Sequence, residues 1–206
     1  GHILPAYSLA KHFKEKEISV KIVSDKRGLK YFPSGHDLKI TQIPSATIYK
    51  KNIFQLFFSI TIMFHALIRA FIFILNNKPD LVFGVGGYSS FPICIAAKIL
   101  KVPFIIYENN LYIGRANRYL LPYAKKIFVS FKELEGISKK YQKKVCQIGN
   151  IIRKEILNFQ QKSDNDINDK KIKILILGGS QAAKVFAERL PQIFKEYFNN
   201  KISLKI

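Results

Sequence analysis

The chain has 206 residues, 48% of them hydrophobic, which is enough apolar material for one large domain or for one domain and part of another. There is no long low-complexity tract, which excludes an extended disordered protein. The two cysteines, Cys94 and Cys146, lack the spacing of metal ligands and fit a reducing compartment. The net charge of +20 raises nucleic acid and anionic lipid as partners. Most basic residues are lysines scattered over predicted helix faces and loops without a nucleic-acid motif, so we favour a solvated lysine-rich surface over a specific polyanion site.

Predicted helices and strands alternate along the chain, which favours a parallel sheet with helices on both faces, an α/β fold. In chain order the elements are helix 3–16, strands 18–24 and 38–43, a long apolar stretch at 53–75, strand 81–85, helix 91–100, strand 103–107, helix 115–124, strand 126–131, helix 133–140, strand 144–148, strand 172–178, helix 181–198 and strand 202–206.

The polar segment 159–171 has almost no apolar pattern and is predicted to be an exposed linker. It separates a first domain, residues 1–158, from residues 172–206, where the strand–helix pattern begins again. The chain starts with Gly1-His2 rather than methionine and stops inside a predicted strand, so we expect both ends to be cut.

The apolar stretch 53–75 is long enough to span a membrane. At about 100° per residue, however, its polar residues and the flanking polar positions fall within an arc of roughly 160°. Because a spanning helix does not need such a stripe, we expect a helix partly buried against the sheet, whose remaining apolar surface suits shallow contact with an anionic membrane. A true spanning helix is the alternative. The polar residues are Gln55, Ser59, Thr61, His65 and Arg69.

Two glycine-rich turns each follow a run of β-branched and aromatic residues. The first is Leu-Val-Phe-Gly-Val-Gly-Gly-Tyr at 81–88, and the second is Ile-Leu-Ile-Leu-Gly-Gly-Ser-Gln at 174–181. A buried strand that ends in glycines and continues into a helix brings bare backbone N–H groups to the positive end of that helix, which suits a phosphate or diphosphate. Glycines that only reverse the chain are the alternative.

Six short motifs occur in a fixed order along the chain. They are Gly-His-Ile-Leu-Pro-Ala at 1–6, Pro-Asp-Leu-Val-Phe-Gly-Val-Gly-Gly-Tyr at 79–88, Tyr-Glu-Asn-Asn at 107–110, Gly-Arg-Ala-Asn at 114–117, Ile-Gly-Asn-Ile-Ile-Arg at 148–153 and Leu-Gly-Gly-Ser-Gln at 177–181. Together they resemble the MurG family of bacterial N-acetylglucosaminyltransferases along the whole chain. The resemblance implies a GT-B fold: a Rossmann-like N-terminal domain without its first strand, followed by the first part of a second Rossmann-like domain.

The resemblance also implies the reaction and its partners. The family transfers N-acetylglucosamine, with inversion, from UDP-N-acetylglucosamine to the muramoyl 4-hydroxyl of the undecaprenyl-diphosphate-linked pentapeptide in peptidoglycan synthesis. It works as a peripheral protein on the cytoplasmic face of the plasma membrane, and needs neither nucleic acid nor a cofactor. Two rival hypotheses are another GT-B glycosyltransferase with a different nucleotide sugar or lipid acceptor, and a non-catalytic basic module that binds membrane surfaces.

Catalytic chemistry is expected at His2 and Glu108. An imidazole at the head of the first helix can take a proton from an acceptor hydroxyl or position the substrate, and a histidine at a helix start can also simply bond to backbone. Glu108 lies at the carboxyl end of a predicted strand, where ligands bind in such sheets. It can orient a sugar hydroxyl or tune a histidine, with ordinary loop capping as the alternative.

The resemblance implies two sets of binding residues. The acceptor diphosphate is expected on Gly84, Gly86, Gly87 and Tyr88, and the donor UDP-sugar on Gly1, Asn110, Arg153 and Ser180. A generic surface ion pair is the alternative for Arg153. No metal-ligand cluster is visible in the sequence, so no metal is expected.

The chain departs from the family pattern at two positions. The last glycine of Gly-Gly-Ser-Gln-Gly is Ala182, which stiffens the second turn, and the proline after Gly-Asn is Ile151, which should make the segment before Arg153 less rigid. The residues expected to contact uracil, ribose and N-acetylglucosamine would lie beyond Ile206. We therefore expect the chain alone to bind donor poorly and not to turn over.

Overall fold

The computed structural model describes residues 2–35, 37–47, 52–157, 172–175, 183–198 and 202–205. The chain divides into two compact units, Gly1–Phe159 and Gln160–Ile206. In the second unit, β7 (Ile172–Leu175) pairs in parallel with β8 (Ile202–Lys205), and α7 (Ala183–Phe198) connects them in sequence.

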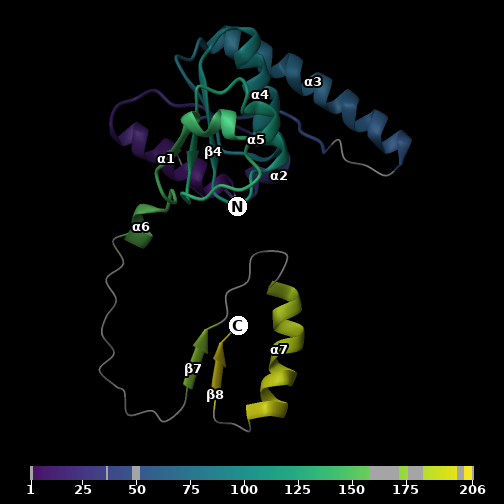
Figure 1. Ribbon diagram of the computed structural model, residues 1–206, viewed down its shortest axis with the longest axis vertical. Coiled ribbons are helices and arrows are strands. Elements are labelled where there is room, and N and C mark those ends of the chain that lie inside the picture. Colours follow the sequence, from purple (N-terminus) through teal and green to yellow (C-terminus); the bar gives the residue numbers. More distant parts are fainter. Residues whose placement is uncertain are drawn as a thin grey trace. The chain divides into compact units, whose positions relative to one another are not determined.

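The centre of the first unit is a four-stranded parallel sheet in the order β3-β4-β5-β6 (Figure 1). Its strands are β3 (Val82–Gly84), β4 (Phe104–Glu108), β5 (Lys126–Val129) and β6 (Val145–Gln147). The register pairs Gly84 with Ile106 and Glu108 with Val129, so the carboxyl ends of the strands lie at one edge of the sheet. Ile106, Ile127 and Val129 are fully buried, as expected for a sheet covered on both faces. The predicted α/β fold is confirmed.

A smaller parallel pair, β1 (Ile22–Ser24) and β2 (Ile40–Gln42), accompanies α1 (Ile3–Glu15) and the short α2 (Lys26–Leu29). The strand predicted at 18–24 is present only from residue 22, and Ile18 is exposed. Asp25 begins α2, because its carboxylate accepts a hydrogen bond from the Gly28 amide.

Two helices cover the sheet and start at glycines. α4 (Gly87–Ile99) follows Gly86 directly, four residues earlier than predicted. Gly86 has φ 91° and ψ −178°, a backbone conformation that only glycine adopts readily, so the chain turns out of β3 and enters the helix at once. α5 (Arg115–Leu120) is shorter than the predicted helix 115–124.

The helix predicted at 133–140 is wrong. The chain there pairs Glu135 with Tyr112 in an isolated parallel bridge, and only a 3-10 helix at Lys139–Lys144 follows. Gly136 has φ 77°, and a Cβ atom there would lie 2.9 Å from both Arg118 and Tyr112. The backbone reversal at this glycine ends any helix that starts before it.

The long α3 (Ile53–Asn77) packs only part of its length and surface against the core. Its buried positions carry mostly small side chains, Ser59, Ala66 and Ala70 with Ile74, and the last three belong to the same core cluster as residues of α4. The N-terminal half of α3 projects from the rest of the unit (Figure 1). The expectation of a helix partly buried against the body, with apolar surface left over, agrees with this arrangement.

Candidate active site

The predicted catalytic residues come together at the carboxyl edge of the sheet. They surround a cavity of about 160 Å³ next to the start of α4. Five predicted site residues line it: His2, Gly87, Tyr88, Glu108 and Asn110. The first amides of α4 have no partner within their own helix, and together with the helix dipole they favour an anion at this end.

The glycine turn and the imidazole of His2 are in direct contact. A Cβ atom built on Gly86 would lie 3.2 Å from His2 Cε1, and one built on Gly87 would lie 3.3 Å from His2 Cδ2. Both glycines have positive φ, 91° and 75°. The turn therefore needs glycine twice over, for its backbone conformation and for the space that the imidazole occupies.

His2 is half-buried in front of this turn. Burial lowers the pKa of its imidazole below the usual 6.5, while the nearby Glu108 carboxylate and the Val85 carbonyl act in the opposite direction. Its Nδ1 atom is buried and has no hydrogen-bond partner. Burial thus favours the neutral form of the ring, which is the form that can accept a proton.

Glu108 is 2% exposed, and both carboxylate oxygens are used inside the adjacent loop. Oε1 accepts from the backbone N (3.1 Å) and the Nδ2 (2.8 Å) of Asn110, while Oε2 accepts from the Gly114 amide (2.8 Å) and Asn117 Nδ2 (3.0 Å). These contacts correspond to the loop-capping alternative. The influence of Glu108 on His2 is electrostatic.

Residues 114–117 also line the cavity, although sequence reasoning gave them no role. Asn117 is 2% exposed; its Nδ2 donates to the Tyr107 carbonyl and to Glu108, while its Oδ1 has no partner. Arg115 adds a positive charge to the same lining. The available signal was the motif Gly-Arg-Ala-Asn itself, four residues after Asn110.

Other predicted site residues lie away from the cavity lining. Gly84 is inside β3, where a Cβ would come within 2.8 Å of Cys94 Sγ, so this glycine serves strand–helix packing. Gly86 is buried beneath His2 rather than part of the lining. Arg153 is exposed just before α6 (Lys154–Leu157). Gly1 and Ser180 lie outside the described residues, as does Ala182.

Within the described part of the chain, no group of three or more His, Cys, Asp or Glu side chains could hold a metal ion. A larger hollow of about 550 Å³ lies beside α3, and it is lined by apolar and polar side chains including Phe54, Phe58 and Arg27. None of the predicted catalytic residues borders it, so the smaller cavity at the sheet edge is the candidate site.

Known proteins share this architecture. The parallel Rossmann-like sheet with a glycine turn at its carboxyl edge has the architecture of the N-terminal domain of a GT-B glycosyltransferase. The chain belongs to glycosyltransferase family 28, whose N-terminal domain matches residues 1–129.

Two curated relatives and one solved structure illustrate the match. The chain is 31% identical over 97% of its length to a protein of Pelagibacter ubique and 33% identical over its full length to one of Rickettsia bellii. Both relatives are named UDP-N-acetylglucosamine–N-acetylmuramyl-(pentapeptide) pyrophosphoryl-undecaprenol N-acetylglucosamine transferase. The crystal structure of Acinetobacter baumannii MurG matches 96% of the chain and 55% of its own, at 25% identity and a TM-score of 0.70. The chain spans about half the length of these relatives, 54% and 57%.

Proposed function

We propose that the chain is the acceptor-binding half of an enzyme that transfers N-acetylglucosamine from UDP-N-acetylglucosamine to a muramoyl-pentapeptide linked through diphosphate to undecaprenol. The reaction class follows from the family and from the names of the relatives. The observation that carries the proposal is the half-buried imidazole of His2, which lies against the glycine turn beside the cavity at the start of α4.

In this mechanism the acceptor diphosphate binds at the start of α4. Main-chain N–H groups at Gly87 and Tyr88 approach its oxygens without obstruction by a Cβ at the first position, and the helix dipole adds favourable potential. The acceptor hydroxyl lies at His2, which takes its proton as the oxygen attacks the anomeric carbon of the donor. Glu108 holds the loop that presents Asn110 to the donor sugar.

The donor is expected to contact Gly1, Asn110, Arg153 and Ser180, as the resemblance implies. The leaving group is UDP, so negative charge grows on its diphosphate as the glycosidic bond breaks. The Arg153 guanidinium and the amides around Ser180 are the groups that would stabilise this charge. No step calls for a metal.

The test is sugar transfer by a chimera in which residues 1–157 are preceded by the N-terminal segment and followed by the C-terminal part of the Pelagibacter ubique relative. His2→Ala and Arg153→Ala should each lower kcat/KM for transfer to a short-prenyl acceptor analogue, by roughly a hundredfold for His2 as expected for loss of a general base. The matched control is His12→Ala, an exposed histidine on the same helix. Full activity of both site variants would overturn the proposed site.

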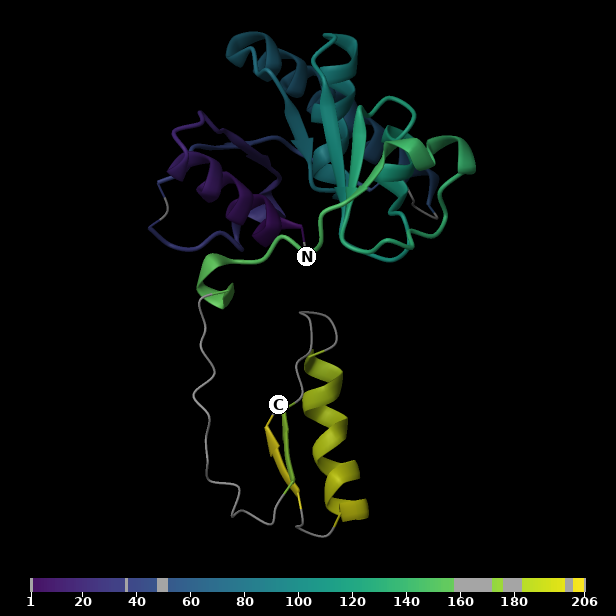
Figure 2. The ribbon, with the colours of Figure 1, turned by 60° about the vertical axis from the view of Figure 1, so that its left-hand side comes forward.

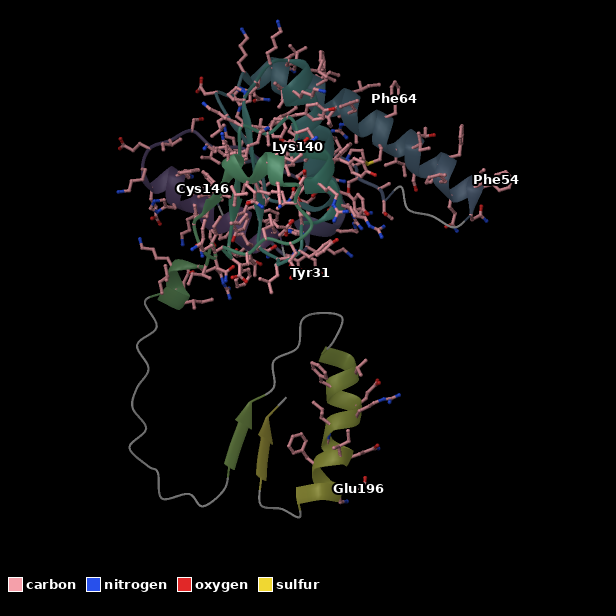
Figure 3. The ribbon with its side chains drawn as sticks, in the orientation of Figure 1. Tyr31, Phe54, Phe64, Lys140, Cys146 and Glu196 are labelled. Carbon is pink, nitrogen blue, oxygen red and sulfur yellow. The ribbon has the colours of Figure 1, made fainter. Side chains whose placement is uncertain are left out.

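We also propose that α3 docks on the cytoplasmic face of the plasma membrane. Phe54 is 82% exposed and Phe64 is 64% exposed (Figure 3). With Phe57, Ile68 and Leu75 they form an apolar stripe on the side of the helix opposite its buried face, and the net charge of +20 favours an anionic surface.

Among the described residues, α3 is the one helix whose length and mean hydropathy of 2.1 would allow it to span a bilayer. Docking is the better supported interpretation, because Ala66, Ala70 and Ile74 are buried in the core of the unit. The projecting residues 53–65 extend about 20 Å at 1.5 Å per residue, short of the roughly 30 Å hydrocarbon core.

Co-sedimentation with phosphatidylglycerol and phosphatidylcholine vesicles tests the docking. Replacing Phe54 and Phe64 by serine should weaken binding to anionic vesicles by about a hundredfold or more, since each phenyl group inserted contributes about 1.5–3 kcal/mol. Tyr31→Ser, which removes an exposed aromatic ring elsewhere, is the control (Figure 3). Resistance to carbonate extraction would instead support a spanning helix.

A further inference from the structure

Tyr107 is the largest fully buried side chain among the described residues, yet it does not line the cavity. It is 1% exposed, and its ring stacks on Phe83 with centroids 6.3 Å apart. Its hydroxyl nevertheless makes three hydrogen bonds: 2.8 Å to Ser130 Oγ, 3.3 Å to the Gly149 carbonyl and 3.2 Å to the Ile151 amide. Two of the three partners belong to the segment that leaves the sheet after β6.

The chemistry of a phenol fixes the direction of each bond. A phenol has one proton to donate and two lone pairs that accept. The Ile151 amide can only donate and the Gly149 carbonyl can only accept, so the remaining lone pair accepts the proton of Ser130. The hydroxyl is therefore fully used, and it ties β4 and β5 to residues 149–151.

These hydrogen bonds, called the tie below, join the surface segment 148–153 to the buried Tyr107. Residues 148–153 belong to no helix or strand, and Asn150, Ile152 and Arg153 are exposed. Farther on, α6 lies beside α1 (Figure 2) and is joined to it by the exposed ion pairs Lys11–Glu155 and Lys154–Glu15, each 3.3 Å. Exposed pairs of this kind contribute little because water screens them.

The identity of residue 151 makes one bond of the tie possible. A proline there, as in the family that the sequence resembles, has no N–H group and could not donate to Tyr107. A proline would restrict φ by its ring, whereas Ile151 gains a hydrogen bond to the core. The hydrogen bond to Tyr107 on β4 thus offsets the loss of rigidity that is expected from Ile151.

We propose that Tyr107 is a positioning residue that acts through the 149–153 segment, holding Arg153 at a fixed place on the first unit in the way a proline would. The consequence for Arg153 rests on the proposed function; the tie itself does not.

Hydrogen exchange of the 206-residue chain tests the tie without any activity. Tyr107→Phe should speed exchange of the segment 148–157 by about tenfold, as loss of hydrogen bonds worth about 1 kcal/mol or slightly more implies. In an Ile151→Pro background the same change should speed exchange of the segment only about threefold, because the bond to the Gly149 carbonyl is then the one hydrogen bond from Tyr107 to the segment that remains to be lost. Tyr123→Phe, on an exposed ring, is the matched control.

Two outcomes would overturn the tie. One is equal acceleration by Tyr107→Phe in both backgrounds. The other is exchange of the Ile151 amide in the unaltered chain at the rate of an unprotected amide. This result does not depend on the variant, so it decides the question even if Tyr107→Phe destabilises the whole sheet.

The chimera supplies the functional readout. Tyr107→Phe should raise the KM for UDP-N-acetylglucosamine about threefold to tenfold while kcat changes less than about twofold, because ground-state placement is lost rather than chemistry. A fall in kcat at unchanged KM would overturn the positioning role. A chimera without transferase activity would count against the proposed function, and the exchange experiment would still decide the tie.

Discussion

Substitution of Gly86 by alanine tests whether the glycine turn constrains the imidazole. At φ 91° and ψ −178° a side chain costs about 1–3 kcal/mol in backbone strain. The new Cβ would lie 3.2 Å from His2 Cε1, 3.3 Å from His2 Nδ1 and 3.4 Å from Asn117 Nδ2, so these groups must move by a few tenths of an ångström. Adding about 1 kcal/mol for this crowding gives a total loss of roughly 2–4 kcal/mol in the free energy of unfolding.

Urea denaturation of the chain measures the loss, and NMR spectra of the His2 ring report its displacement. Two control variants separate the contributions. Gly35→Ala has φ 74° with nothing within 4 Å, so it measures strain alone, about 1 kcal/mol. Gly84→Ala has no positive φ but crowds Cys94 Sγ at 2.8 Å, so it measures crowding alone. The reasoning would be refuted if Gly86→Ala and Gly35→Ala unfolded with the same urea midpoint and the His2 resonances of Gly86→Ala were unchanged.

Three further predictions concern titratable groups. Burial raises the pKa of Cys94 to about 12. At pH 8 a thiol reagent should therefore modify the exposed Cys146 and leave Cys94 unmodified until the chain unfolds. Modification of both thiols at equal rates in the native chain would contradict the burial of Cys94. Burial lowers the pKa of His2 in the folded chain, so as pH falls below 6.5 the imidazole is protonated in the unfolded chain before it is protonated in the folded one. His2 therefore lowers the free energy of unfolding between pH 6.5 and its folded pKa. A titration midpoint of the His2 ring at or above 6.5 by NMR would contradict this. Burial is the largest single influence on the Asp25 carboxyl and raises its pKa, but the hydrogen bonds that it accepts, led by the one from the Ser45 hydroxyl, lower the pKa overall. Asp25 therefore stabilises the folded chain above pH 3.8, and this stabilisation is lost as the pH falls through the folded pKa. Asp25→Asn should cost about 1–3 kcal/mol at pH 7 by urea denaturation and flatten this acid limb, and an unchanged limb would speak against the assignment.

The sequence predicts α3 but not which of its faces is buried. Its polar residues mark one stripe, which predicts a helix partly buried against the sheet but does not say which apolar residues are buried. In the structure the small side chains of Ala66 and Ala70 face α4, while Phe57 and Phe64 face outward. Close approach of two helices is limited by side-chain size, so the size pattern within an apolar run determines the packed face, and hydrophobicity alone does not.

Elements predicted from local pattern fail where a distant segment competes. The pattern at 133–140 favours a helix, but Glu135 exchanges backbone hydrogen bonds with Leu111 and Ile113, which come from the loop after β4. Such pairing depends on the placement of two loops and has no local signal. Gly136 is visible in the sequence and could have suggested the break, because glycine readily adopts the positive φ that the structure shows there.

The candidate site was predictable to the extent that it is local. The glycine turn and the helix-start histidine are adjacent to their own secondary structure, and the motif order placed them together. The unpaired Oδ1 of Asn117 was not predictable, because its amide is oriented by the Tyr107 carbonyl and by Glu108, nine residues away. Hydrogen-bond orientation of this kind emerges only when strand ends and loops are assembled.

The end of β4 explains why both loops at the sheet edge are fixed at once. Successive residues of a strand point to opposite faces. Glu108 therefore gathers residues 110–117 around the cavity, while Tyr107 gathers residues 149–151 on the other side. Both are carried by a strand paired on its two sides, to β3 and β5, so neither loop can shift without breaking hydrogen bonds to a buried, rigid element. A sheet edge built in this way keeps residues 110–117, which border the cavity, and residues 149–151 in fixed positions relative to each other.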